Sequence, residues 1–265
     1  MTATHVLRTL ACATVLCAFA AGAAAQKADA PAVAAPPAPS VGQAGKDVVW
    51  VPTPQALVDR MLDLAKVTSR DTVIDLGSGD GRTVVTAAKR GARALGIEYN
   101  PDMVTLARER ARREGVAERA RFEKQDLFTT DLSPATVITM FLLTDINLKL
   151  RPKLLELKPG TRVVSNTFTM GEWEPDATAT LTPAQCADAW CTALLWIVPA
   201  RVAGTHATPR GELTLEQTFQ KVSGTLKTEN GTVPVTGTVR GEEVVLQAGG
   251  RTLRGTAGGR GLELK

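Results

Sequence analysis

The sequence predicts an α/β protein whose parallel sheet is followed by a small antiparallel β unit. Between residues 72 and 168, apolar runs of strand length alternate with amphipathic segments of helix length, which is typical of a doubly wound parallel sheet. The first apolar run ends in a turn with three glycines, and in such sheets a ligand site lies at the carboxyl ends of the strands. From about residue 209, short alternating runs separated by glycines indicate antiparallel strands instead. The 265 residues, 44% of them apolar, suffice for one α/β domain with an accessory unit.

The N-terminal segment has the layout of a secretory signal peptide. His5 and Arg8 precede an apolar stretch at about residues 10–20, and an alanine triplet ends at Ala25. We expect cleavage near Ala25 and export, to the periplasm, or membrane anchoring if the segment stays uncleaved. The apolar stretch is shorter than the roughly 20 residues of a spanning helix, so we expect no stable membrane span after cleavage.

Composition divides the remaining chain. Residues 26–46 are rich in Ala and Pro and predict an extended linker. We therefore expect a signal peptide at residues 1–25, a linker at 26–46, an α/β domain at 47–207 and a small β-rich domain at 208–265.

The elements of the α/β domain follow from periodicity and from start and stop residues. The first helix is expected after Thr53 as its N-cap, with Pro54 at the first helical position. Strands are expected at 72–77, 92–98, 120–127, 135–143 and 161–168. Helices are expected between them at 81–90, 101–115 and 145–157. In the tail, Asn230-Gly231 indicates a tight hairpin.

Four cysteines divide between the two ends of the chain. Cys12 and Cys17 lie within the predicted signal peptide, which leaves Cys186 and Cys191 in the mature chain. An even count behind an export signal favours a disulfide, and two free buried thiols are the alternative. A C-x4-C pair without nearby His does not indicate a metal site, so none is expected.

The turn after the first strand has the spacing G-x-G-x-G at Gly77, Gly79 and Gly81. Arg82 stands where the dinucleotide pattern G-x-G-x-x-G has its third glycine, which weakens an NAD interpretation. Asp75 before the turn and Asp80 within it add negative charge. The turn therefore suits a ligand with a positive end and no phosphate.

Two further acids close the next two strands. Glu98 closes the second, where a carboxylate accepts both ribose hydroxyls of a nucleoside. Asp126 closes the third and is placed to accept from an adenine amino group. Singly, each acid is also explained as a helix N-cap or a solvated strand end. Together with the acidic glycine turn they indicate S-adenosylmethionine as the cofactor.

The stretches "VIDLGSGDGR", "GIEYN" and "KQDLF" resemble motifs of the class I S-adenosylmethionine-dependent methyltransferases. More narrowly, "VWVPTPQALVDRML", "TMFLLTDINLKLRPKLLELKPGTRVVSNTF" and "GEW" resemble a lysine methyltransferase family. That family includes mitochondrial enzymes acting on membrane proteins, and many bacterial relatives. The resemblance covers about residues 47–175, and the export signal and the β-rich tail depart from it.

The resemblance implies a Rossmann-like, seven-stranded methyltransferase sheet whose last two strands form a hairpin, supplied by residues 176–183 and 191–202. With the neighbours of the motif residues, the expected cofactor-binding set is Thr53, Asp75, Gly77, Ser78, Gly79, Asp80, Gly81, Glu98, Asp126 and Leu127.

The methyl acceptor is expected beside the fourth strand. Phe141, Leu142 and Leu143 form either an apolar wall near the methyl group or ordinary sheet core. Polar contacts to the acceptor are expected from Thr144, Asp145 and Asn147, and Trp173 either closes the pocket or packs. No catalytic base is identified, because methyl transfer depends mainly on orientation and desolvation.

The predicted function is methyl transfer to a protein lysine or another amine. The alternatives are a small-molecule methyltransferase and a non-catalytic exported module that retains the cofactor site. The net charge of +4 arises from 31 basic and 27 acidic residues without a basic run interleaved with aromatics. A nucleic-acid partner is therefore not expected, and the oligomeric state is left open.

Overall fold

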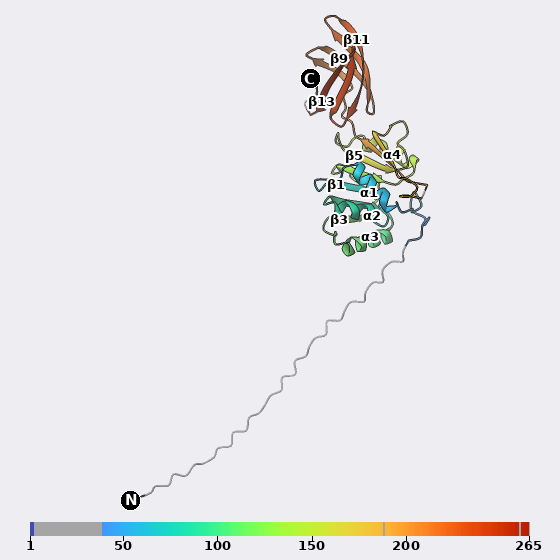
Figure 1. The fold of residues 1–265 in the computed structure, drawn as a ribbon, viewed down its shortest axis with the longest axis vertical. Helices are drawn as coiled ribbons and strands as arrows, with labels where there is room; N and C mark the ends of the chain where they lie inside the picture. The colour runs from blue at the N-terminus through green and yellow to red at the C-terminus, as the bar shows by residue number, and fades with distance from the viewer. Residues whose placement is uncertain (3–38, 188, 260, 265) are drawn as a thin grey trace. The chain divides into compact units, whose positions relative to one another are not determined.

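A computed structural model describes residues 1–2, 39–187, 189–259 and 261–264. The predicted signal peptide and most of the predicted linker lie outside these residues, apart from residues 1–2 and 39–46. Within the described residues the chain forms two seven-stranded sheets (Figure 1). The first is mixed and carries helices, and the second is antiparallel, so the predicted fold class is confirmed.

The first sheet has the strand order β3-β2-β1-β4-β5-β7-β6. Its strands are β1 (Thr72–Leu76), β2 (Arg93–Glu98), β3 (Ala120–Lys124), β4 (Val137–Met140), β5 (Arg162–Asn166), β6 (Ala177–Thr180) and β7 (Thr192–Ile197). The first five are parallel, and β7 lies antiparallel between β5 and β6. The last two strands thus form the predicted hairpin. Because β7 runs in the opposite sense, its first residue lies at the edge where the parallel strands end.

Helices cover both faces of this sheet. They are α1 (Gln55–Leu64), α2 (Arg82–Lys89), α3 (Pro101–Arg113) and α4 (Thr144–Leu154). Val73 on β1 packs in a buried cluster with residues of α1, α2 and α3, whereas the next residue, Ile74, packs in a second cluster with residues of α4. Successive strand side chains point to opposite faces, so one apolar strand supplies both cores.

The start of α1 differs from the prediction. The N-cap is Pro54, in an extended conformation with ψ of 140°, and no side chain caps this end. Thr53 Oγ1 instead accepts a hydrogen bond from Asn166 Nδ2 at 3.5 Å, which ties the segment before α1 to the end of β5. By contrast, α3 begins at Pro101 as predicted, with the Asn100 side chain accepting from the backbone N–H of Asp102 at 2.9 Å.

The second sheet is a simple meander in chain order. Its strands are β8 (Gly204–Thr208), β9 (Gly211–Thr218), β10 (Lys221–Thr228), β11 (Gly231–Arg240), β12 (Glu243–Ala248), β13 (Arg251–Gly258) and β14 (Gly261–Leu264). The Asn230-Gly231 turn joins β10 to β11 as predicted. The sheet begins at Gly204 and not at residue 208, because β8 pairs along its whole length with β9.

The turn between β9 and β10 contacts residues of the α/β domain that contains the first sheet. The Phe219 ring stacks on Trp173 with centroids 6.0 Å apart, and the Arg151 guanidinium lies 5.1 Å from the Phe219 centroid. Gln220 Nε2 donates to the carbonyl oxygen of Glu174 at 2.8 Å. Phe219 has a φ of +54°, a strained value for a non-glycine residue, which these contacts hold in place.

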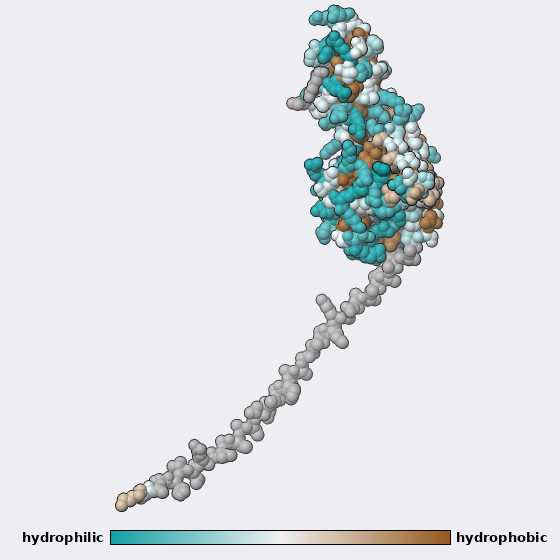
Figure 2. Space-filling model, viewed as in Figure 1, coloured by the Kyte–Doolittle hydropathy of each residue, from teal (hydrophilic) through white to brown (hydrophobic). Residues whose placement is uncertain are grey.

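No helix in the described part of the chain is long and apolar enough to cross a membrane. Figure 2 shows a mainly hydrophilic face on which hydrophobic residues form small, separate patches. Among the described residues, the exposed large apolar side chains outside residues 1–49 are Tyr99, Leu143 and Trp190. All three lie near strand ends at one edge of the first sheet, which is the edge where the candidate site is found.

Candidate active site

A pocket lies at the carboxyl ends of β1, β2 and β4 and the loop after β3. Most of the predicted cofactor residues line it: Thr53, Asp75, Gly77, Ser78, Gly79, Asp80, Glu98, Asp126 and Leu127. Phe141 and Leu142 of the predicted acceptor wall line it as well. Side chains far apart in sequence meet there because parallel strands end at the same edge of a sheet.

The glycine turn needs glycine at two positions because of their backbone conformation, and at one of them also because space is short. Gly77 and Gly79 have φ values of +74° and +52°, in the left-handed region. A Cβ atom on Gly79 would lie 2.5 Å from Trp50 Nε1, so a larger residue would collide with the segment that covers the turn. The turn is tied to β2 by the backbone N–H groups of Gly77 and Ser78, which donate to the Ile97 carbonyl at 2.9 and 3.0 Å.

Gly81 is the exception among the predicted cofactor residues. It is the N-cap of α2, with φ of +79°, and does not line the pocket. A Cβ atom there would lie 2.7 Å from the Phe122 ring and 2.8 Å from Ala107 Cβ. Gly81 therefore permits close packing of α2 against α3 and β3.

Asp75 is a deeply buried acid of the pocket that has no ion-pair partner among the described residues. It is 6% exposed, and Thr139 Oγ1 donates to its Oδ1 at 2.6 Å. Burial raises the pKa of Asp75 to about 7, the charges of Glu98 and Asp80 add to the rise, and the Thr139 hydrogen bond opposes it. A cationic group placed beside Asp75 would favour its ionised form, so this carboxyl suits the positive end of a ligand.

Two backbone amides fix the orientation of Glu98. Its Oε2 accepts from the N–H of Gly79 and its Oε1 from the N–H of Asn100, both at 2.9 Å. A carboxylate has about four lone-pair positions, so each oxygen keeps capacity for a further hydrogen bond. Glu98 can therefore receive a pair of hydroxyls without moving.

Asp126 lies two residues beyond the end of β3, not within the strand as predicted. Its Oδ1 accepts from the N–H of Phe128 at 2.9 Å, and its Oδ2 accepts from Lys46 Nζ at 3.0 Å. The Phe128 amide first, and then Lys46, hold the pKa of Asp126 below its ordinary value. Asp126 thus stays ionised and keeps its ability to accept from an amino group.

The segment before α1 forms one side of the pocket. Residues 43–53 line it, although residues up to 46 belong to the predicted linker. The Lys46 ammonium lies 5.3 Å from the Tyr99 ring centroid and 5.7 Å from that of Phe128. Hydrophobic periodicity in the sequence does not predict these contacts. The one sequence feature that indicates them is Trp50, a large apolar residue that has no role in the predicted first helix. Other pocket residues absent from the predicted set are Tyr99, Asn100, Met103, Gln125 and Met140.

Asp80 lines the pocket, but its charge is paired with two arginines. It is 5% exposed and forms ion pairs with Arg82 at 2.7 Å and Arg110 at 2.9 Å. Burial alone would raise the pKa of Asp80, but the hydrogen bonds and charges of Arg82 and Arg110 lower it below its ordinary value. Asp80 therefore links α2 to α3. Asp75 is the acid of this turn region that can pair with a cationic group in the pocket.

The predicted acceptor residues divide among the pocket, the surface and the core. Leu142 is 2% exposed and lines the pocket with Phe141, whereas Leu143 and Thr144 do not line it. Asn147 is fully buried, and its Nδ2 donates to the backbone carbonyls of Phe168 at 3.1 Å and Thr169 at 3.2 Å. Asn147 therefore supports the chain after β5 and is withdrawn from any contact with an acceptor.

Trp173 does not close the pocket. It is fully buried, and its ring contacts Trp196 and Phe219 with centroids 6.2 and 6.0 Å away. Its carbonyl oxygen accepts from Trp196 Nε1 at 2.7 Å. The packing alternative for Trp173 is therefore the correct one, because the second sheet covers it.

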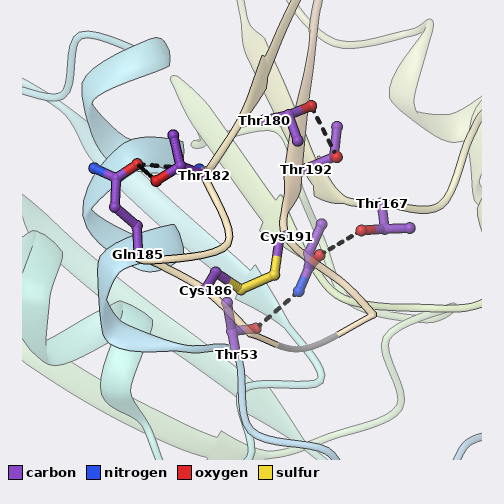
Figure 3. Close-up of a disulfide and its surroundings, with 9 residues drawn as sticks. Thr53, Thr167, Thr180, Thr182, Gln185, Cys186, Cys191 and Thr192 are labelled. Carbon is purple, nitrogen blue, oxygen red and sulfur yellow. Dashed lines mark hydrogen bonds between the residues drawn. A yellow bond between two sulfur atoms is a disulfide. The ribbon is translucent and has the colours of Figure 1, made fainter.

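Cys186 and Cys191 form a disulfide, the alternative that the even cysteine count favoured (Figure 3). Their Cα atoms are 5.9 Å apart. Cys186 is buried in the cluster beneath α1, and Cys191 precedes the first residue of β7. The bond closes the loop between β6 and β7 at its β7 end.

The residues of the pocket fit S-adenosylmethionine. Glu98 offers fixed acceptors for two hydroxyls, Asp126 an acceptor for an amino group, and Asp75 a partner for a cation. Ser78 Oγ is buried without a hydrogen-bond partner among the described residues, which leaves a polar group at the turn to be satisfied. Ile97, Leu127 and Met140 supply apolar surface for a nucleoside.

Comparison with known proteins agrees with this chemistry. The family model of the ANTKMT methyltransferase domain matches residues 75–177. A protein-lysine N-methyltransferase of Saccharolobus islandicus (strain REY15A) is 50% identical over 131 residues, which are 48% of this chain and 81% of the relative. The adenine nucleotide translocase lysine N-methyltransferase of Mus musculus is 40% identical over 107 residues, and the match covers 40% of this chain but only 47% of that protein.

A solved structure matches the same part of the chain. The crystal structure of an RNA methyltransferase from Salinibacter ruber in complex with S-adenosyl-L-homocysteine has a TM-score of 0.53 and 49% sequence identity. The match covers 57% of this chain and 96% of that one.

Proposed function

This chain belongs to the family of S-adenosylmethionine-dependent lysine methyltransferases that carry the ANTKMT methyltransferase domain, and we propose that it methylates a lysine amine of a protein acceptor. The observation that carries the proposal is the meeting of Asp75, Glu98 and Asp126 around one pocket that continues into the apolar wall of Phe141 and Leu142. An acid-lined nucleoside site next to an apolar wall is what methyl transfer to an amine requires.

The pocket residues divide the binding of the cofactor among them. Glu98 accepts the ribose hydroxyls, Asp126 accepts the adenine amino group, and Asp75 faces the cationic end. When bound, S-adenosylmethionine supplies an electrophilic methyl group, which a neutral amine gains as the carbon–sulfur bond breaks. Residues 43–53 and the wall at Leu142 exclude water from this reaction, and exclusion of water strengthens the electrostatic interactions inside.

The apolar wall also prepares the acceptor. An amine must lose a proton before it becomes a nucleophile, and a pocket wall without carboxylates lowers the pKa of an amine by desolvation. We expect the rate to rise with pH as the acceptor deprotonates.

The names of the relatives support a protein acceptor, since both of the relatives described above are lysine N-methyltransferases. The Salinibacter ruber structure is described as an RNA methyltransferase, so RNA is the competing acceptor to test. The absence of a basic run with interleaved aromatics in the sequence argues for the protein.

The test is incubation of the purified protein with tritiated S-adenosylmethionine and an extract of its own cells. The extract is then separated into protein, RNA and low-molecular-mass fractions. We expect label in protein, on lysine by mass spectrometry, and much less label with the Glu98→Ala variant at a cofactor concentration below its dissociation constant. Label confined to RNA or small molecules contradicts the proposal, and no label despite measured cofactor binding favours a non-catalytic module.

We also propose that the protein is exported and acts in an oxidising compartment. The disulfide between Cys186 and Cys191 supports this, because such bonds persist outside the reducing cytosol. Mass spectrometry of the N-terminus in fractionated cells tests it, with cleavage near Ala25 expected. A cytosolic chain with an intact N-terminus and two free thiols contradicts export.

A further inference from the structure

Three aromatic side chains from separate loops meet beside the pocket: Phe141 after β4, Phe168 after β5 and Trp190 before β7. The Phe141 and Phe168 rings stack with centroids 5.9 Å apart and an interplanar angle of 26°. Trp190 meets Phe141 edge to face at 6.0 Å and 61°. Phe141 also lines the pocket, so this aromatic cluster continues the pocket wall outward. Phe168 and Trp190 have no role among the residues predicted from the sequence.

The cluster stands open to solvent on one side. Trp190 is 36% exposed, a high value for so large an apolar side chain, while Phe141 and Phe168 are half-buried. An ordinary core would bury these rings completely. Their partial exposure beside the pocket indicates a surface that contacts a ligand as the ligand enters the pocket.

The backbone that carries Phe168 is held in a strained conformation. Thr167 has a φ of +60°, which is unfavourable for a β-branched residue, and the N–H of Phe168 donates to the Asn166 carbonyl at 2.7 Å across this tight turn. The Thr167 N–H donates to the Thr192 carbonyl at 2.7 Å, and Asn147 holds the next carbonyls from below. Strain of this kind persists only where the surroundings enforce it, and it is concentrated at functional sites.

The disulfide anchors the third ring. Cys191 is bonded to the buried Cys186 (Figure 3). Trp190 directly precedes Cys191 in the sequence, so the bond fixes the chain next to Trp190. Thr180 and Thr192 hydrogen bond across β6 and β7 at 3.0 Å, immediately beyond this bond. Three different structural features therefore hold the cluster: the end of β4 holds Phe141, a strained turn holds Phe168, and a disulfide holds Trp190.

Building on the proposed function, we propose that Phe141, Phe168 and Trp190 form the entrance through which the acceptor lysine side chain reaches the cofactor. Aromatic faces attract an ammonium group, and they attract the methylated ammonium of the product as well. Their apolar area buries the four-carbon stem of the lysine side chain. The three rings themselves carry no carboxylate that would hold the amine protonated. Trp190 is the specificity residue, and the disulfide is its positioning device.

The first test measures initial rates on the full-length protein with S-adenosylmethionine and poly-L-lysine as the probe acceptor. We expect Trp190→Ala to raise the KM for poly-L-lysine about tenfold and to leave the dissociation constant of S-adenosylhomocysteine within about twofold of wild type. Trp190→Phe restores most of the loss, because a ring face is kept. The paired change Cys186→Ser with Cys191→Ser raises the KM in the same direction by a smaller factor. Phe219→Ala removes a ring remote from the cluster and serves as the matched control, with an unchanged KM.

The outcomes separate this proposal from the proposed function. Methylated poly-L-lysine with an unchanged KM in Trp190→Ala overturns the entrance alone. Methylation of RNA in place of poly-L-lysine overturns both.

A second readout needs no turnover. In protein loaded with S-adenosylhomocysteine, we expect n-butyltrimethylammonium, which mimics a methylated lysine side chain, to shift the indole NMR signal that disappears in Trp190→Phe. No shift at millimolar concentrations, or an equal shift with n-butanol, refutes the cation-binding role of the ring.

Discussion

The two sheets of this protein have the same number of strands and very different chemistry. In the first, parallel strands bring Asp75, Glu98 and the Asp126 loop to one edge, where they surround a pocket. In the second, neighbouring strands run in opposite directions, so successive strand ends alternate between edges and polar residues at these ends are dispersed. Its interior is filled by apolar side chains such as Leu213 and Leu246. Strand direction, and not strand number, decides whether a sheet assembles a site.

The largest expected effect is on cofactor binding through the first sheet. Glu98→Ala should weaken S-adenosylmethionine binding by about 1.5–3 kcal/mol, the range for hydrogen bonds to a charged group, which is roughly 10- to 150-fold in the dissociation constant. Titration calorimetry measures it. Glu216→Ala, an exposed acid of β9, is the matched control and should change nothing. Equal affinity for wild type and a folded Glu98→Ala removes Glu98 from the site.

The junction of the two sheets should matter for stability and not for binding. Phe219→Ala removes a half-buried ring from Trp173 and Arg151, and we expect a loss of about 2 kcal/mol in the free energy of unfolding, below the ~3–5 kcal/mol of a fully buried Phe. Urea unfolding measures it, alongside calorimetry of cofactor binding. If cofactor affinity falls with stability unchanged, the second sheet takes part in the site.

The titration of Asp75 should give the first sheet a pH dependence that the second lacks. The pKa of Asp75 is about 7 in the folded protein against 3.8 for an ordinary Asp, so the folded state keeps a proton that the unfolded state releases. The contribution of Asp75 to stability is therefore present in full below about pH 4 and is lost as the pH rises to about 7. The free energy of unfolding of Asp75→Asn, measured in urea at several pH values, should not show this decrease between about pH 4 and pH 7.

The same group should set the pH dependence of binding. A cationic ligand prefers ionised Asp75, so affinity should rise by up to about tenfold between about pH 6 and pH 8, with proton release. Asp75→Asn keeps the acceptor for Thr139 and retains only the titration of the ligand itself. An identical pH profile in this variant contradicts the role of Asp75.

The smallest effect is expected at the segment covering the pocket. Lys46 pairs with Asp126 at a partly exposed position, where solvent and salt screen the interaction and leave it weak. Since we propose that Asp126 accepts from the cofactor's amino group, Lys46→Met should strengthen binding by about twofold, measured by the same calorimetry. The increase should vanish in high salt if ion pairing is its cause, and a clear loss of affinity would mean that Lys46 binds the cofactor itself.

Much of the fold could be predicted because its signals are local. Strand-length apolar runs, Pro101 at a helix start and Asn230-Gly231 at a hairpin each act within a few residues, and the structure has the elements they predict. The glycine turn and Glu98 could be predicted for the same reason. Each follows directly from the sequence at the end of a strand and does not depend on how the rest of the chain packs.

Only the tertiary structure decided which residues share a space. Asp80 in the glycine turn is paired with Arg110 of α3, Trp173 is covered by the second sheet, and Lys46 reaches the pocket from the predicted linker. The meeting of Phe168 and Trp190 with Phe141 depends on three loops and a disulfide. The sequence by itself determined a parallel sheet with an acid-lined nucleoside site, because strand periodicity and strand-end acids are short-range properties. Charge pairing and ring packing are long-range contacts, which exist only after the chain has folded.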